Sequence, residues 1–234
     1  MRKRAFVLPI ILVFALTAQA AGPKSMTRTI PAGDIEALDL ESGIGDVTIT
    51  ARTGLDEVAI EVVLTPRRGG IFSSKRQAES DVQAASLETA VKRDRLKLRI
   101  DAPKDDDDRR FEERWIIEIP SRLMVKLEHG VGDVTIRGVT AGVELDSGVG
   151  DVEVVVPEGN VNVDLGVGTA VVRAPAAAYA AAEAAGGVGS ARLEVQGENI
   201  ESGGFVSKSA SWSGDGRYRI DVAVGVGDAV IELD

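Results

Sequence analysis

Six short Gly-x-Gly segments carry the residues of this chain whose types and spacing best suit chemistry. They begin at Gly43, Gly130, Gly148, Gly166, Gly187 and Gly225, and the third copy reads GVGDVEV. A glycine-rich loop can cradle phosphate, but such a loop occurs once per nucleotide and joins a strand to a helix. Here alternating apolar residues, typical of a strand, follow every copy. The pattern therefore argues against a nucleotide site.

A carboxylate follows the second glycine in four of these copies. The residues are Asp46, Asp133, Asp151 and Asp228, while Thr169 and Ser190 occupy the same position in the other two. If neighbouring copies stack, Asp133 and Asp151 lie about 4.8 Å apart, so a cation between them is one interpretation. The other is capping of backbone N–H groups, which Asp, Thr and Ser can all perform. The Thr and Ser replacements favour capping, and the G-G-x-G-x-D pattern of calcium β-rolls is not met.

Other candidate catalytic or binding residues are isolated. His129 is the single histidine and there is no cysteine, so a zinc site or a Cys/His pair lacks ligands. The consecutive carboxylates 105–108 indicate a solvated loop, since calcium loops alternate their ligands. An enzyme of the polysaccharide-processing kind could use Asp133 and Asp151 near Arg137, but no catalytic constellation stands out. Phe205 and Trp212 could contact a sugar, although covering the side of the fold is the favoured role for both.

The elements that position these segments are strands. Val143 and Leu145 precede the corner at Val149, and Val152 and Val154 follow it, so each flank alternates with period two. The two flanks are out of phase by one residue, which requires a bulge or sharp corner at Gly-Asp. Glycine permits the positive φ of such a corner. We therefore assign structural corner roles to Gly43, Gly45, Asp46, Gly130, Gly132, Asp133, Gly148, Gly150, Asp151, Gly166, Gly168, Gly187, Gly189, Gly225, Gly227 and Asp228.

The spacing of the copies predicts a repeat architecture. Successive first glycines are 87, 18, 18, 21 and 38 residues apart, and a second break at Gly, Pro or Asn divides each unit. We expect an all-β fold: a two-sheet β-solenoid, or β-helix-like stack, of about 18–21-residue coils within one domain at 21–234, with regular coils over 123–234. The Ala-rich stretch 175–185 should form a thin strand there. Residues 196–217 are either a degenerate coil or a surface excursion.

Residues 54–122 do not repeat. We expect strands at 57–65 and 114–120, a short helix at 73–85, and a hairpin formed by 87–91 and 96–100. These elements would interrupt the stack of coils.

The first twenty residues predict export. MRKR is basic, the following stretch is apolar, and AQA before Ala21 is a small-x-small cleavage site, so 1–20 is interpreted as a signal peptide. The apolar stretch is shorter than a membrane span requires. Cleavage would change the formal net charge from −10 to −13, because three basic residues leave. Such an acidic domain repels nucleic acid.

The order of these segments resembles the bacterial putative-adhesin families of unknown function. ALDLESGIGDVTIT, then the non-repeating stretch ending in LKLRI, then IIEIPSRLMVKLEHGVGDVTIRGVTAGVELDSGVGDVEV carry the resemblance, which covers about 30–234. It implies a β-solenoid-like domain outside the cytoplasm and supplies no catalytic residues.

These observations together predict a non-enzymatic, exported β-repeat protein without a cofactor, periplasmic, secreted or at the cell surface. It would present sheet faces and loops to a protein or glycan of the cell envelope. Self-association through the C-terminal strand is a further expectation, because an exposed last strand can pair with another chain. The alternatives are a polysaccharide-processing β-helix enzyme and a periplasmic component of an envelope-stress system.

Overall fold

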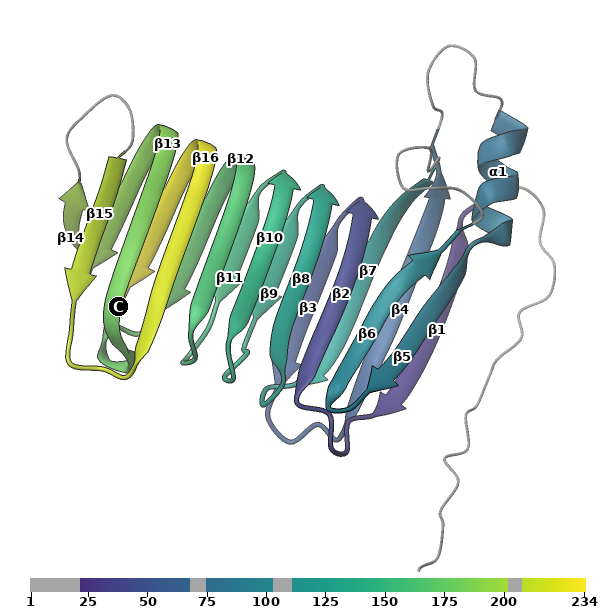
Figure 1. Cartoon of the computed structure of the whole chain (residues 1–234), viewed down its shortest axis with the longest axis horizontal. Helices are drawn as coiled ribbons and strands as arrows, with labels where there is room; N and C mark the ends of the chain where they lie inside the picture. The colour runs from purple at the N-terminus through teal and green to yellow at the C-terminus, as the bar shows by residue number, and fades with distance from the viewer. Residues whose placement is uncertain (1–21, 68–74, 103–110, 202–207) are drawn as a thin grey trace, which may run out of the picture.

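The computed structural model describes residues 22–67, 75–102, 111–201 and 208–234, and strands dominate it (Figure 1). The alternating apolar residues predicted at 57–65, 87–91, 96–100 and 114–120 all lie in strands. The elements are β1 Lys24–Pro31, β2 Ala37–Ile44, β3 Val47–Arg52, β4 Glu57–Pro66, α1 Lys75–Ala84, β5 Ser86–Lys92, β6 Arg95–Asp101, β7 Phe111–Pro120, β8 Met124–Val131, β9 Val134–Arg137, β10 Val143–Val149, β11 Val152–Val155, β12 Val161–Ala174, a 3-10 turn Ala176–Ala178, β13 Tyr179–Val195, β14 Glu198–Glu201, β15 Lys208–Ser213 and β16 Tyr218–Leu233.

The all-β class is confirmed, but the predicted two-sheet solenoid stack is wrong. The strands hydrogen-bond into one 16-stranded sheet with the main path β1-β4-β7-β3-β9-β11-β12-β10-β8-β2-β6-β5. This 12-strand path forms a nearly closed, barrel-like sheet. The long strand β12 makes the path continuous, because its first half pairs with β10 and its second half with β11.

The order of the strands also departs from the order of the chain. β16 lies between β12 and β13 and pairs in parallel with both, from Ile220 to Leu233. The 38-residue step is therefore not a skipped coil. Residues 198–201 and 208–213 form β14 and β15, which pair antiparallel with β13 at this end of the sheet. β16 has a partner strand on each side, so the C-terminal strand is not the exposed edge on which the expected self-association depended.

The non-repeating residues 54–122 lie at the end of the molecule opposite β13, β14 and β15, instead of interrupting the repeated strands (Figure 1). β2 pairs directly with β8 across the intervening 54–122. The predicted hairpin is present as β5 and β6, and α1 covers the described part of the predicted helix. Arg28 on β1 donates a hydrogen bond to Thr89 on β5, and Lys24 donates to the carbonyl oxygen of Ala85, so side chains link the two ends of the path.

One apolar core runs the length of the sheet. Leu38, Leu127, Leu145 and Val163 lie at most 1% exposed, and the alternation of each strand points them inward. The Ala-rich stretch does form part of β13, where Ala182 pairs with Ile220 and is buried. Tertiary pairing overrides the helix propensity of alanine there, and the small side chains narrow the core.

Several sequence predictions fall outside the described residues: the signal peptide 1–20, the carboxylates 105–108 and Phe205. Within the described residues, no helix is both long and apolar enough to cross a membrane.

Candidate functional site

The six Gly-x-Gly segments meet along a single edge of the molecule, where their middle residues form one row. Parallel pairing places each middle residue beside the next: Ile44 with Val131, Val131 with Val149, Val149 with Val167, Val167 with Val226, and Val226 with Val188. We call these six residues the valine ridge. Its residues come from segments up to 182 residues apart in the sequence, from Ile44 to Val226.

Glycine is required on both sides of the ridge because neighbouring strands approach each other there through their backbone atoms. A Cβ on Gly150 (φ +143°) would lie 1.9 Å from the carbonyl oxygen of Gly132. A Cβ on Gly148 would lie 2.5 Å from the carbonyl oxygen of Gly130. The glycines on each side of the ridge therefore allow neighbouring strands to pass at backbone contact distance, which any larger residue would prevent.

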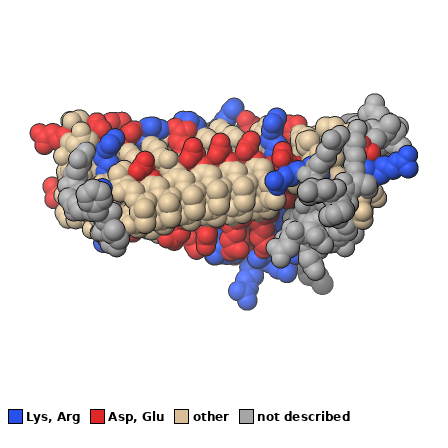
Figure 2. All heavy atoms as spheres, turned by 90° about the horizontal axis from the view of Figure 1, so that it is seen from above, with Lys and Arg blue, Asp and Glu red and all other residues tan. Residues whose placement is uncertain are grey.

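The valine ridge is exposed although it is apolar. Val131, Val149 and Val167 are each 45% exposed, Val226 is 49% and Val188 is 58%. Figure 2, which views this edge from above, shows an uncharged band along the molecule with carboxylates on both sides. A contiguous exposed apolar strip of this kind marks an interaction site more often than isolated surface valines do.

The corner aspartates form the first acidic flank, and they bond to the next strand rather than locally. The Oδ1 of Asp133 accepts from the backbone N–H of Asp151 at 3.0 Å, and the Oδ1 of Asp151 accepts from the N–H of Thr169 at 3.0 Å. Asp46 receives the N–H of Asp133 at 3.3 Å. At Asp228, the N–H and hydroxyl of Ser190 both donate to Oδ1, and these bonds hold the pKa of the carboxyl below its usual value.

This geometry bears on the cation interpretation of Asp133 and Asp151. One oxygen of each carboxylate is occupied by a backbone N–H, so the two side chains cap successive strands. Among the described residues, no group of three or more His, Cys, Asp or Glu side chains is arranged to hold a metal ion.

The second acidic flank lies on the other side of the ridge. Glu41, Glu128, Asp146 and Asp164 are exposed and pair in register on β2, β8, β10 and β12. Ala223 and Ala185 take this position on β16 and β13. A groove of about 750 Å³ opens there, bordered by Asp146, Asp164 and Lys208.

A row of buried polar side chains lies directly beneath the ridge. Glu113 on β7 is 1% exposed and accepts hydrogen bonds from the indole N–H of Trp115 at 2.8 Å and the hydroxyl of Ser42 at 3.2 Å. His129 and Ser147 continue the row on β8 and β10. The structure describes no hydrogen-bond partner for either ring nitrogen of His129 or for the Ser147 hydroxyl.

Burial governs the protonation of His129. The side chain is 6% exposed, and desolvation lowers the pKa of its imidazole, outweighing the raising effect of the Gly132 and Ser42 backbone groups. His129 is therefore neutral at pH 7 and shielded from solvent, a poor position for a general base that must reach a substrate.

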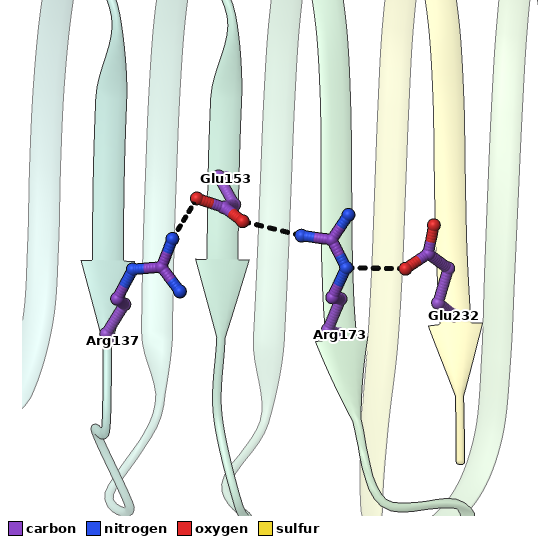
Figure 3. Close-up of polar contacts among 4 residues, drawn as sticks. All are labelled: Arg137, Glu153, Arg173 and Glu232. Carbon is purple, nitrogen blue, oxygen red and sulfur yellow. Dashed lines mark hydrogen bonds and ion pairs between the residues drawn. The ribbon is translucent and has the colours of Figure 1, made fainter.

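The structure does not bring Arg137 into a constellation with Asp133 and Asp151. Arg137 instead belongs to a charge ladder across β9, β11, β12 and β16 (Figure 3). It pairs with Glu153, which also pairs with Arg173 at 2.5 Å, and Arg173 pairs with Glu232 at 2.5 Å. These half-exposed pairs link four strands side by side. Trp212 lies on β15 packed against the core, which fits the covering role expected of it.

Sequence reasoning missed Glu113 and the second acidic flank. Glu113 falls in a charged stretch, yet the alternation of Phe111, Trp115 and Ile117 already marks its position as inward-facing. The acidic flank could have been found by aligning the copies three residues before the ridge. Its importance depends on the strand order, which the alignment does not reveal.

The all-β fold has a counterpart among solved structures. No family model and no curated protein matches the sequence. The fold is similar to that of a putative cell adhesion protein from Clostridium sporogenes, with TM-score 0.60 and 18% identity over 91% of this chain and 100% of that chain.

Weaker matches are a putative adhesin from Bacteroides fragilis, with TM-score 0.29 and 12% identity, and one from Parabacteroides merdae, with TM-score 0.25 and 11% identity. Each match covers 90% of this chain and 97% of the other.

Proposed function

We propose that this chain is an exported, non-enzymatic, adhesin-like binding protein that engages a partner at the cell envelope through its valine ridge. The observation that carries the proposal is the row of five valines, each at least 45% exposed, between two lines of carboxylates. Exposing this apolar area to water costs free energy unless a partner covers it. The backbone of the ridge is already paired from strand to strand, which leaves its side chains as the means of recognition.

Three further observations support the proposal. The basic and apolar first twenty residues have the pattern of an export signal. A solved structure with a similar fold is named a putative cell adhesion protein. His129 is buried, and the aspartates beside the ridge are engaged with backbone N–H groups, so these groups serve the fold rather than catalysis.

The test is a binding screen with the exported protein immobilised by a tag. Envelope extracts and a glycan array are each passed over the protein and over the V149T/V167T variant. Threonine is close to valine in shape, and these side chains are exposed, so the variant should fold. We expect saturable capture by the parent protein that the variant weakens. Failure of the parent protein to retain anything from either source would contradict the proposal.

A further inference from the structure

We infer that the valine ridge docks a cationic amphipathic helix of a protein partner, with the apolar stripe of the helix on the valines and its basic residues beside the two acidic flanks. This inference rests on the proposed binding function and names the chemistry of the partner.

Charge complementarity specifies a basic partner. Four exposed carboxylates, Glu41, Glu128, Asp146 and Asp164, line one side of the ridge. The four corner aspartates line the other side, and each of the described capping bonds uses only Oδ1. A segment with Lys or Arg on both borders of an apolar stripe would meet a carboxylate at most rungs, and such complementarity favours association and register.

The spacing of the ridge matches a helix. Neighbouring strands are about 4.8 Å apart, so the six ridge residues span about 24 Å. Apolar residues at alternating steps of three and four on a helix recur every 5.3 Å or so, and about 16 residues cover the same length. In an extended strand laid along the ridge, side chains on one face recur only every 6.7 Å or so, and they fall out of step with the valines, about 4.8 Å apart, after two of them.

Other occupants fit less well. A second copy would place its own carboxylate flanks against these carboxylates, in a chain whose formal net charge is −10. A glycan would find no aromatic side chain at the ridge or flank positions, which hold Gly, Val, Ile, Asp, Glu, Thr, Ser and Ala. Anionic lipid and nucleic acid are repelled by the same charge.

The experiment uses a synthetic 18-residue probe helix with leucine at alternating steps of three and four and lysine on both borders. A scrambled peptide of identical composition is the control for charge alone. Fluorescence anisotropy measures binding of each labelled peptide to the exported protein at low and high salt. We expect saturable one-to-one binding of the amphipathic probe, at least tenfold tighter than binding of the scrambled peptide.

Three matched variants locate the binding. V149T/V167T removes ridge methyl groups, and E128Q/D146N neutralises two flank carboxylates that cap no backbone group in the described structure. D56N/D215N neutralises two exposed carboxylates in the turns at the opposite ends of the strands. We expect the first two variants to weaken binding about tenfold, E128Q/D146N also to reduce the salt dependence, and D56N/D215N to leave binding unchanged. Thermal melting confirms that each variant is folded.

The inference would be overturned if D56N/D215N weakened probe binding as much as E128Q/D146N does, or if the scrambled peptide bound as tightly as the amphipathic probe. Either result would show attraction by net charge alone. Concentration-dependent dimers that V149T/V167T abolishes would assign the ridge to a second copy and also overturn it. The proposed function is tested separately by the envelope screen. If the screen yields a glycan bound at the ridge, the proposed function stands and the helix inference falls. If the screen yields nothing, or only a ligand whose capture V149T/V167T does not affect, the proposed function itself falls.

Discussion

Replacement of Gly150 by alanine tests the close approach of the strands beneath the ridge. The new Cβ would lie 1.9 Å from the carbonyl oxygen of Gly132, whereas real Cβ atoms stay at least 3.0 Å from such an atom. The strands must therefore separate by about 1 Å. That movement strains two hydrogen bonds between these strands, from the Gly132 N–H to the Val149 carbonyl oxygen at 2.8 Å and from the Val134 N–H to the Asp151 carbonyl oxygen at 2.9 Å.

The magnitude follows from these contacts. Each hydrogen bond contributes about 0.5–1.5 kcal/mol net, and alanine at the φ of +143° costs about 1–3 kcal/mol. We expect the free energy of unfolding to fall by about 3–5 kcal/mol, measured by urea denaturation followed by circular dichroism. Gly54 provides the matched control, because its φ is +83° but no atom lies within 4 Å of an added Cβ. The G54A substitution should cost only the backbone strain, about 1–2 kcal/mol.

The comparison of the two variants is decisive. If G150A destabilises the protein no more than G54A does, the strands are not in close contact at the corner, and the assignment of the glycines to backbone packing is refuted. A loss confined to G150A supports it.

Three further predictions concern the polar groups around the ridge. Burial lowers the pKa of His129, so the unfolded chain binds a proton more readily, and the free energy of unfolding should fall as the pH drops below the unfolded pKa of about 6.5. H129L, which places on this row the leucine found at Leu165, should reduce the difference between urea midpoints measured at pH 7.5 and pH 5. An unchanged difference would contradict the burial of the imidazole. D133A should lower the free energy of unfolding by about 1 kcal/mol, and D133N, which keeps an accepting oxygen, should lower it less; equal losses would count against capping. Calcium should not change the melting temperature of the parent protein. E153Q should lower the free energy of unfolding by less than about 1 kcal/mol in dilute buffer and by less still at high salt, because the arginine partners of Glu153 are half exposed. A loss that does not depend on salt would contradict this screening of the charge ladder.

The local structure could be predicted from the sequence because the strand segments before and after each corner show the period-two alternation of apolar residues. Val143 and Leu145 before the corner, and Val152 and Val154 after it, are all buried as their alternation indicates. The phase change between them required a corner at Gly150, and the positive φ of that residue supplies it. These features depend on neighbours in the chain, which a sequence displays directly.

The pairing order could not be predicted, and the physical reason is the repeat itself. Every copy presents the same apolar columns, so Ile220 on β16 can pair equally well with Val161 or Ala182, and in the structure it pairs with both. Strand order then depends on the connections, and the long excursion through β14 and β15 lets β16 enter between β12 and β13.

Cysteine cross-linking tests most directly whether the ridge is assembled in this order, since the chain has no cysteine of its own. V167C/V226C places cysteines on neighbouring strands about 4.8 Å apart, within disulfide range, whereas V167C/V188C places them about twice as far apart, beyond it. We predict that mild oxidation links the first pair and not the second. Rapid linkage of 167 to 188, with none between 167 and 226, would contradict the ridge as described.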